Sequence, residues 1–583
     1  MVYDPGTDHY VPITWKDAFE LFGRVVRGLD DPNQASYYTS GRLGNEATFL
    51  YQLMAPELGT NNLPDCSNMC HKASGRALQA SLGTGRGTAD LKDWETAAAL
   101  FIMGVNAASN APRMLTALAE AYRRGARIVH INPLVEAAAN RTIVPHGFLD
   151  MALLRGMAKA VLEQSGTDPK ALDREFVDRH TTGFVEYRAL CENTSWAELE
   201  RQSGLRRADI VKAARVYCDV DRRIFSWCLG VSQHEHGVDT AREIVNLLLR
   251  RGNLGREGAG PSPRTRAQQC PGEPHLRHRP PAHRRVPGAP RRRLRDRSAA
   301  PDTPYTYAAL RSCELTVQVS TKLNRSHLVH GRQALILPCL GRTEKDRQRR
   351  GLQSTSAEDS MSMVHLSVGM KRPASRHLLS EPAVIAGLAR AALPGSATPW
   401  EWYVEDYDRI RNTMAQVLVS FEDFNRRVRL PLGLRIKQPA RELVFHTPTG
   451  SAEISTAPLP DVVPAAGSLV LGTMRSHDQW NTTIYSDDDR YRGVKNLRTL
   501  VFMNEDDMRE RGIAEFGRVD ITATARDGST RSLDGYLAIP YDIPRGCAAG
   551  YMPEMNVLSA IGDYSTQSDQ PLMKHINVAI TAA

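Results

Sequence analysis

Two cysteines in one short stretch are the residues of this 583-residue chain best suited to chemistry. Cys66 and Cys70 lie four residues apart in DCSNMCH, and His71 follows Cys70 directly. A thiolate is a soft metal ligand, and an imidazole takes up a proton near neutral pH. The stretch permits a metal-bound thiolate with an acid or base beside it. It equally permits a Cys-x3-Cys half-site for zinc or an iron–sulfur cluster, or two packed thiols.

Glycine and asparagine follow two predicted strands. The apolar run 97–103 ends at Gly104-Val105-Asn106, residues 113–124 form an amphipathic helix pattern, and the strand 127–131 ends at Asn132-Pro133. In an open parallel sheet, ligands bind beyond the carboxyl ends of the strands. We therefore expect a nucleotide at Gly104, Asn106, Asn132 and Pro133, although Gly and Asn also serve ordinary turns.

Further elements extend this α/β pattern. Helices are expected at 153–163 and 210–218, and a strand at 223–229 ends at Gly230. A helix at 240–251 runs into Gly252-Asn253-Leu254-Gly255, so Gly230, Asn253 and Gly255 join the candidate cofactor-binding residues. Residues 315–319 and 334–338 look like two more strands of an α/β sheet. Alternation at 519–524, the turn signal Asp527-Gly528 and a return strand at 533–539 predict a C-terminal β-barrel-like domain.

A loop near residue 475 offers groups for an anion. It reads GTMRSHDQWNT from Gly472 to Thr482, in which Arg475 and His477 suit a phosphate and the polar side chains supply hydrogen bonds. A solvated, charged loop is the alternative. Weaker candidates of the same kind are Asn556, Gln567, Ser568 and Lys574.

The net charge of +9 belongs to one segment. Residues 264–297 hold eleven Arg against one Glu and one Asp, and the rest of the chain is formally neutral. A nucleic-acid partner, which a basic chain would otherwise indicate, is therefore not expected. The segment 261–301 has almost no aliphatic residues and no helical or strand period. It is either a disordered basic linker or coding sequence translated out of frame.

Length and composition set the remaining limits. The chain is long enough for three or four lobes, and its 42% apolar and 24% charged residues are ordinary for a soluble globular protein. The nine cysteines are scattered and do not look like a disulfide framework. We find no membrane span and no leader at the N-terminus, so a cytoplasmic location is expected.

The motifs together resemble a known family. GTNNLPDCSNMCH, followed by ASG and SLGTGRG, resembles the active-site loop of formate-dehydrogenase-like molybdopterin oxidoreductase alpha subunits, in which a Cys or selenocysteine precedes His. GVNAASN, NPLVE and GTMRSHDQWNT resemble the loops that bind its pterin guanine dinucleotides. The resemblance implies that Cys70 binds molybdenum, that His71 is the neighbouring acid or base, and that the cofactor is molybdenum bis(molybdopterin guanine dinucleotide). The cofactor-binding residues it implies are Gly104, Asn106, Asn132, Pro133, Gly230, Asn253, Gly255, Thr473, Arg475, His477, Asn481 and Thr482.

The resemblance also implies an architecture. We expect a multidomain α/β molybdopterin oxidoreductase fold with Rossmann-like domains and a C-terminal β-barrel-like domain. Its ranges are 1–90 for the region carrying the Cys70 loop, 91–260 for a Rossmann-like cofactor-binding domain, 261–302 for the aberrant Arg/Pro-rich segment, 303–465 for the rest of the α/β core, and 466–583 for the β domain.

The implied reaction is two-electron redox of a small substrate, with formate to carbon dioxide as the default. An electron-transfer partner is implied as well. Family members commonly carry cysteines for a [4Fe-4S] cluster upstream of the position of Met1, and no such set occurs in this chain. A catalytically inactive relic of such an enzyme is the second hypothesis. An anion-binding or nucleic-acid-binding protein, resting on the basic segment alone, is the third.

The segment after Gly260 bears on these alternatives. Permitted codons for 264–272, read one base later, give VRGHSNVQ, which resembles the family sequence at this point and includes its substrate-orienting arginine. No Arg between 264 and 297 can be assigned to that role. Relative to the family, the chain also starts late and is shortened near 149–154 and 299–303.

Overall fold

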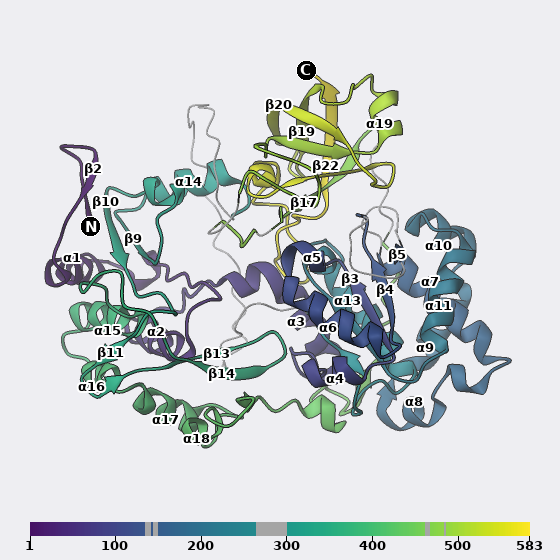
Figure 1. Ribbon diagram of the computed structural model, residues 1–583, viewed down its shortest axis with the longest axis horizontal. Coiled ribbons are helices and arrows are strands. Elements are labelled where there is room, and N and C mark those ends of the chain that lie inside the picture. Colours follow the sequence, from purple (N-terminus) through teal and green to yellow (C-terminus); the bar gives the residue numbers. More distant parts are fainter. Residues whose placement is uncertain (135–141, 144–149, 264–299, 461–466, 478, 483–485) are drawn as a thin grey trace. The chain divides into compact units, whose positions relative to one another are not determined.

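The computed structural model describes residues 1–134, 142–143, 150–263, 300–460, 467–477, 479–482 and 486–583 (Figure 1). Their contacts form two compact units. The first comprises Met1–Ser67 and Pro304–Lys437, and the second comprises the described residues of 68–263 and 300–303 with those of Gln438–Ala583. Almost all of the aberrant segment 261–302 lies outside the described residues, so the expected change of reading frame there is not tested.

A five-stranded parallel sheet organises the second unit (Figure 1). Its order is β5 (Thr142–Ile143), β4 (Arg127–Ile131), β3 (Ala99–Met103), β7 (Arg223–Trp227) and β8 (Gly260–Pro261). The chain runs outward from β3 through β4 to β5, and then returns to β7 on the other side of β3. The strand order therefore reverses between β3 and β7, which is where open α/β sheets bind ligands.

Apolar burial explains why these strands and helices form. Every residue of β3 and β7 is buried, as expected for central parallel strands, and the rings of Phe101 and Phe225 stack at 4.4 Å. Helices α7 (Asp150–Ser165), α11 (Arg207–Cys218) and α13 (Gly237–Arg250) contribute to this core, and α6 (Pro112–Arg123) lies between β3 and β4 in the chain. The strands and helices predicted for these regions are confirmed within a few residues at their ends.

The C-terminal part of the second unit is a closed barrel. Its strands follow the order β17 (Leu469–Met474), β21 (Cys547–Tyr551), β18 (Leu500–Met503), β20 (Thr530–Pro540), β19 (Arg518–Thr524) and β22 (Ile576–Ala582). In β19 and β22, buried and more exposed residues alternate, which places one face of each strand in the core. The predicted β-barrel domain is confirmed.

The first unit has a sheet of its own. It is ordered β2 (His9–Val11), β1 (Val2–Asp4), β10 (Gln333–Pro338) and β9 (Leu315–Ser320), with β9 and β10 parallel. Helices α1 (Trp15–Arg27), α2 (Asn45–Glu57), α15 (Glu381–Ala392) and α17 (Tyr407–Val417) contribute to its core. The strands predicted at 315–319 and 334–338 are therefore correct, but they pair with the N-terminal strands in a second sheet.

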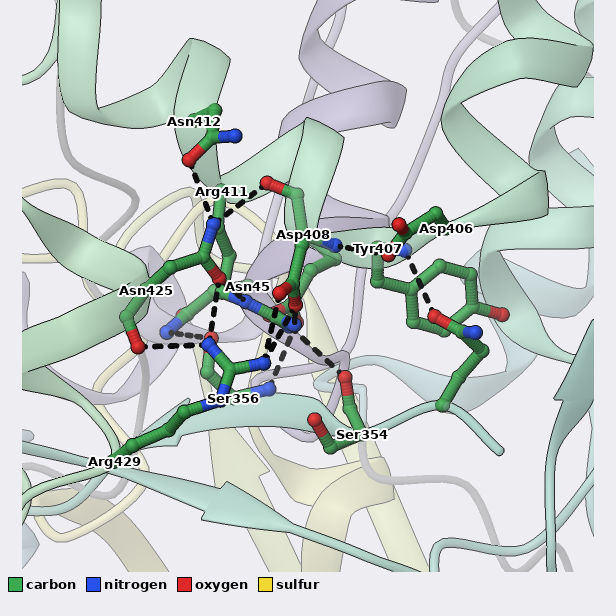
Figure 2. Close-up of polar contacts among 12 residues, drawn as sticks. Asn45, Ser354, Ser356, Asp406, Tyr407, Asp408, Arg411, Asn412, Asn425 and Arg429 are labelled. Atoms are coloured by element: carbon green, nitrogen blue, oxygen red, sulfur yellow. Dashed lines mark hydrogen bonds and ion pairs between the residues drawn. The ribbon is translucent and has the colours of Figure 1, made fainter. Parts of the chain in front are cut away.

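A buried ion pair joins helices α2 and α17 of the first unit. Figure 2 shows the polar contacts around Arg411, one of its two members. The Arg411 guanidinium on α17 lies 2.6 Å from the Glu46 carboxylate on α2, and both side chains are almost fully buried. Arg411 also donates to the Asn425 side chain at 2.7 Å and to the Ser354 carbonyl at 3.0 Å. A buried charge network of this kind is tolerated because its members are hydrogen-bonded. We assign it a structural role.

Both units are built from segments far apart in the sequence. The chain passes from the first unit to the second within helix α3 (Cys66–Leu82), and it returns to the first unit for residues 304–437. The five domain ranges expected from the sequence are consecutive, whereas each of these units combines separate segments. The five ranges stay a prediction about domain organisation.

Candidate cofactor site

Two glycines meet at the point where the strand order reverses. The Gly230 N–H donates to the Gly104 carbonyl at 3.0 Å, and the Gly104 N–H donates to the Ile131 carbonyl at 3.1 Å. A Cβ atom built on Gly230 would lie 2.4 Å from the Gly104 Cα, and Gly104 has a φ of +56°. Only glycine fits such a backbone contact. The loops after β3 and β7 thus present bare backbone at the carboxyl edge of the sheet.

The predicted asparagines lie at the same edge. Asn106 and Asn132 are both buried, and the Asn132 side-chain amide donates to the Asn106 side-chain oxygen. The Leu134 N–H donates to the Asn132 side-chain oxygen at 3.2 Å. Pro133 lies between these two residues. The structure therefore brings together Gly104, Asn106, Asn132, Pro133 and Gly230, as the sequence predicts for a nucleotide-binding edge.

Asn253 and Gly255 lie at the opposite end of the sheet. The Asn253 side-chain oxygen accepts from the N–H of Arg223, which is the first residue of β7. Gly255, with a φ of +71°, packs against Leu443, whose Cδ2 would lie 2.9 Å from a Cβ built there. These contacts lie near the amino end of β7. Asn253 and Gly255 therefore do not join Gly104, Asn106, Asn132, Pro133 and Gly230 at the carboxyl edge of the sheet.

The two cysteines of α3 have different surroundings. Cys70 is half-buried, and its carbonyl accepts from the Ser232 hydroxyl at 3.2 Å, while His71 is buried. Cys66 accepts the Gly41 N–H at 2.8 Å, and burial raises the pKa of its thiol. A raised thiol pKa disfavours the thiolate that a metal requires. These two features disfavour Cys66 as a metal ligand, whereas Cys70 remains the ligand that the resemblance implies.

No zinc-like cluster accompanies these cysteines in the described part of the chain. Among those residues, the structure brings no three His, Cys, Asp or Glu side chains into a group that could hold a metal ion. A structural zinc site needs four protein ligands.

Two half-buried cations, Arg475 and Lys574, lie near two thiols. Partial burial lowers the pKa of Arg475, which follows β17, and electrostatic interaction with Cys228 and Cys70 opposes that shift. Burial and the charge of Arg475 lower the pKa of Lys574 to about 8, while its ammonium group donates to the Thr473 carbonyl.

A cation that folding largely removes from water normally has a carboxylate partner. Within the described residues, neither Arg475 nor Lys574 forms an ion pair with a carboxylate. Their location therefore suits an anionic ligand.

The rest of the Gly472–Thr482 loop is held by internal contacts. The His477 ring lies 4.0 Å from the Tyr491 ring, and its Nε2 lies 2.7 Å from a guanidinium nitrogen of Arg490. The Gln479 amide donates to the Asn481 carbonyl at 2.9 Å, and Asn481 has a φ of +49°. Thr482 follows in the same turn. Thr473 and Arg475 thus lie beside Lys574, while the side chain of His477 contacts Arg490 and Tyr491, which follow the loop.

Three residues of this site were missed or underrated from sequence. Cys228 follows β7 directly and is not among the candidates predicted from the sequence, and Lys574 is only a weak candidate there. Asp150 begins α7 and is buried, and burial raises the pKa of its carboxyl group to about 7. The helix that Asp150 begins also carries Arg155, Lys159 and Glu163, so its charge does not single it out in the sequence. Nothing in the local sequence marks Cys228.

Comparisons with known proteins agree with this geometry. A family model described as molybdopterin oxidoreductase matches residues 3–316. An uncharacterized oxidoreductase of Mycobacterium tuberculosis is 41% identical over 639 residues, covering 100% of this chain and 82% of the relative. The F420-dependent formate dehydrogenase subunit alpha of Methanocaldococcus jannaschii is 27% identical over 260 residues, covering 44% of this chain and 37% of that protein.

The fold is shared with a solved structure as well. Acetylene hydratase from Pelobacter acetylenicus matches with a TM-score of 0.70 at 13% identity, covering 98% of this chain and 90% of that one. The chain belongs to the molybdopterin oxidoreductase family. The predicted resemblance, the fold class and the assignment to the molybdenum-dependent oxidoreductases are thereby confirmed.

Proposed function

We propose that this chain holds molybdenum bis(molybdopterin guanine dinucleotide) and carries out two-electron redox chemistry on a small substrate. The observation that carries the proposal is the pair Arg475 and Lys574, two half-buried cations near the Cys70 thiol that form no ion pair with a carboxylate among the described residues. A ligand with phosphate groups and a metal that binds thiolate would satisfy both the cations and the sulfur.

The residues at the sheet edge fit such a ligand. Bare backbone at Gly104 and Gly230 allows close approach of a pyrophosphate, and amide side chains at Asn106 and Asn132 can bond to ribose or base. The Asp150 carboxyl group begins α7 and has no hydrogen-bond partner among the described residues. A guanine ring, which presents adjacent N–H donors, is a suitable partner for it.

The reaction we propose first is oxidation of formate, in which HCOO⁻ gives CO₂, one proton and two electrons. The bound cofactor supplies the two-electron acceptor. Arg475 and Lys574 attract an anion and lower the free energy of the Cys70 thiolate. The buried imidazole of His71, next to the ligand, accepts the proton. The partial match to a formate dehydrogenase subunit supports formate as the substrate.

Several finer features belong to the same proposal. The two electrons leave to a partner protein, as the resemblance to the family implies. Among the described helices, none combines the length and the apolar character that crossing a bilayer requires. We propose a cytoplasmic location and no nucleic-acid partner.

An inactive relic is the second candidate, and one observation favours it. The alignment with the mycobacterial relative spans 639 residues although this whole chain has 583, so the relative carries internal segments that this chain lacks. The position at which the family has its substrate-orienting arginine also falls in residues 264–297, where no Arg can be assigned to that role. A protein with an intact cradle and a damaged substrate site would bind the cofactor without turning over.

Molybdenum and pterin analysis of the purified chain, together with formate-dependent reduction of a viologen dye, separates the candidates. The proposed enzyme contains both molybdenum and pterin, and it reduces the dye. A relic with an intact cradle contains both but leaves the dye oxidised. A well-folded chain that contains neither would contradict both candidates.

A further inference from the structure

One fully buried amide contacts the helical turn that carries Cys70 and His71. Gln570 is 0% exposed, and its amide nitrogen donates to the Met69 carbonyl at 3.1 Å. Its amide oxygen accepts from the Ala73 N–H. A single side chain therefore contacts the backbone on both sides of Cys70 and His71.

The two backbone groups are significant because of their spacing. In an α-helix, the carbonyl of residue i pairs with the N–H of residue i+4, and Met69 and Ala73 have this spacing in α3. The Gln570 side chain supplies the acceptor for the Ala73 N–H and the donor for the Met69 carbonyl. A side chain inserted at a hydrogen-bonded pair of this kind is a recognised cause of local helix bending. The position of Cys70 thus depends on a residue five hundred positions away in the chain.

Gln570 is itself held by a fixed loop. The Ser565 N–H donates to the Gln570 carbonyl at 2.8 Å, and the Ser565 hydroxyl donates to the Glu235 carbonyl at 2.8 Å. The neighbouring Asp569, at a φ of +55°, forms an ion pair with Lys72 at 2.7 Å. The amide is consequently presented by a loop that is bonded to α3 and to the segment before α13.

We propose that Gln570 is a positioning residue that sets the geometry of the Cys70–His71 turn. The inference rests on the proposed function, because it assigns Cys70 as the metal ligand. The amide is suited to this role since it both donates and accepts, and each of the two backbone groups needs the opposite partner. Leucine offers neither function. Glutamate keeps the shape and the acceptor but, when ionised, loses the donor.

Hydrogen exchange of the Ala73 amide in the full-length chain without molybdenum tests the contact itself. In Gln570→Leu we expect exchange at Ala73 to become at least ten-fold faster, and in Gln570→Glu to stay within about three-fold of wild type, because the acceptor remains. Gln567→Leu is the matched control. Gln567 is an exposed amide in the same segment that donates to Asp239 at 2.7 Å, and its loss should leave Ala73 unchanged.

A second measurement separates positioning from support of the fold. The rate of Cys70 alkylation by iodoacetamide, read by peptide mass spectrometry against Cys228 in the same sample, should rise at least three-fold in Gln570→Leu. Exchange at Ile102 in the centre of β3 should stay at its wild-type rate, which would show that the sheet is folded. If Gln570→Leu does not fold, Gln570→Glu still tests the proposal above about pH 9, where a buried glutamate is ionised: its lost donor to Met69 should raise Cys70 alkylation relative to Cys228 while Ala73 stays protected.

Three results would overturn the inference. Unchanged Ala73 exchange in a folded Gln570→Leu protein would show that the amide does not hold the turn. Faster exchange with unchanged Cys70 alkylation would show structural support alone. Folded Gln570→Glu with wild-type Cys70 alkylation above about pH 9 would show that the donor has no role. These readouts need no bound cofactor, so a wild-type chain that binds no molybdenum would refute the proposed function separately.

Discussion

Replacing Gly230 by alanine should disturb the edge of the sheet that the proposed cofactor loops share. The new Cβ would lie 2.4 Å from the Gly104 Cα and 2.6 Å from the Gly104 carbonyl oxygen. Non-bonded carbon atoms prefer about 3.5–4 Å, so the two backbones must separate by about 1 Å. The 3.0 Å hydrogen bond from the Gly230 N–H to Gly104 would then be lost.

These terms give a magnitude. Overpacking costs about 1–3 kcal/mol, and the lost hydrogen bond adds about 0.5–1.5 kcal/mol, so Gly230→Ala should lower the free energy of unfolding by about 2–4 kcal/mol. Gly104→Ala carries a further cost of about 1–2 kcal/mol because of its positive φ. The double variant should cost less than the sum of the two single variants, because the first substitution has already separated the backbones.

Urea unfolding followed by tryptophan fluorescence, with molybdenum and pterin content measured alongside, tests this prediction. Two glycines with nothing within 4 Å of a built Cβ are matched controls: Gly562 for the crowding alone, and Gly125, at a φ of +91°, for the positive φ alone. Gly562→Ala should be nearly neutral. Additive effects at Gly104 and Gly230, or a cofactor content equal to wild type in both, would refute the reasoning.

Three further predictions concern buried charges. Arg411→Met leaves the buried Glu46 carboxylate unpaired and should destabilise the protein by about 3–5 kcal/mol in urea unfolding; an effect below 1 kcal/mol would mean that the pair is dispensable. Burial raises the folded-state pKa of Asp150 to about 7, so the folded protein binds the extra proton between about pH 4 and pH 7 and loses stability as the pH rises. The thermal midpoint of Asp150→Asn, measured relative to that of wild type, should therefore rise across this pH range and stay constant at higher pH. A difference that does not change with pH would be inconsistent with the raised pKa. Arg475→Gln should lose molybdenum and pterin without lowering the thermal midpoint of the cofactor-free chain, because it removes a half-buried cation that pairs with no carboxylate among the described residues; a lower midpoint would indicate a structural role.

The sequence predicted the sheet edge well because the signals were local. An apolar run followed by Gly104 or Asn132 is a strand with a turn at its carboxyl end, and parallel strands place such turns side by side. The alternation of apolar and polar residues at 519–524 is a local signal of the same kind, and it predicted strand β19 of the barrel. Asn253 looked equivalent to these residues but lies at the other end of β7, since a loop motif does not reveal the end of the sheet to which its helix returns.

Long-range partners could not be predicted from the sequence. Cys228 and Lys574 come beside Cys70 only through the packing of β7 and the barrel segment, and neither stands in a distinctive motif. Gln570 contacts a turn five hundred residues earlier, and Gln567 in the same segment looked like the better candidate. The separate sheet of the first unit was also missed, because it depends on pairing of the N-terminal strand β1 with β10.

Molybdenum K-edge X-ray absorption of the purified chain tests the central claim most directly. We predict that wild type contains molybdenum with a shell of sulfur ligands, and that Cys70→Ala loses one sulfur from that shell. Cys66→Ala is the matched control and should keep the full shell, because the Cys66 thiol accepts the Gly41 N–H as a packed group. An identical sulfur count in wild type and Cys70→Ala, or a folded wild-type chain without molybdenum, would contradict the account.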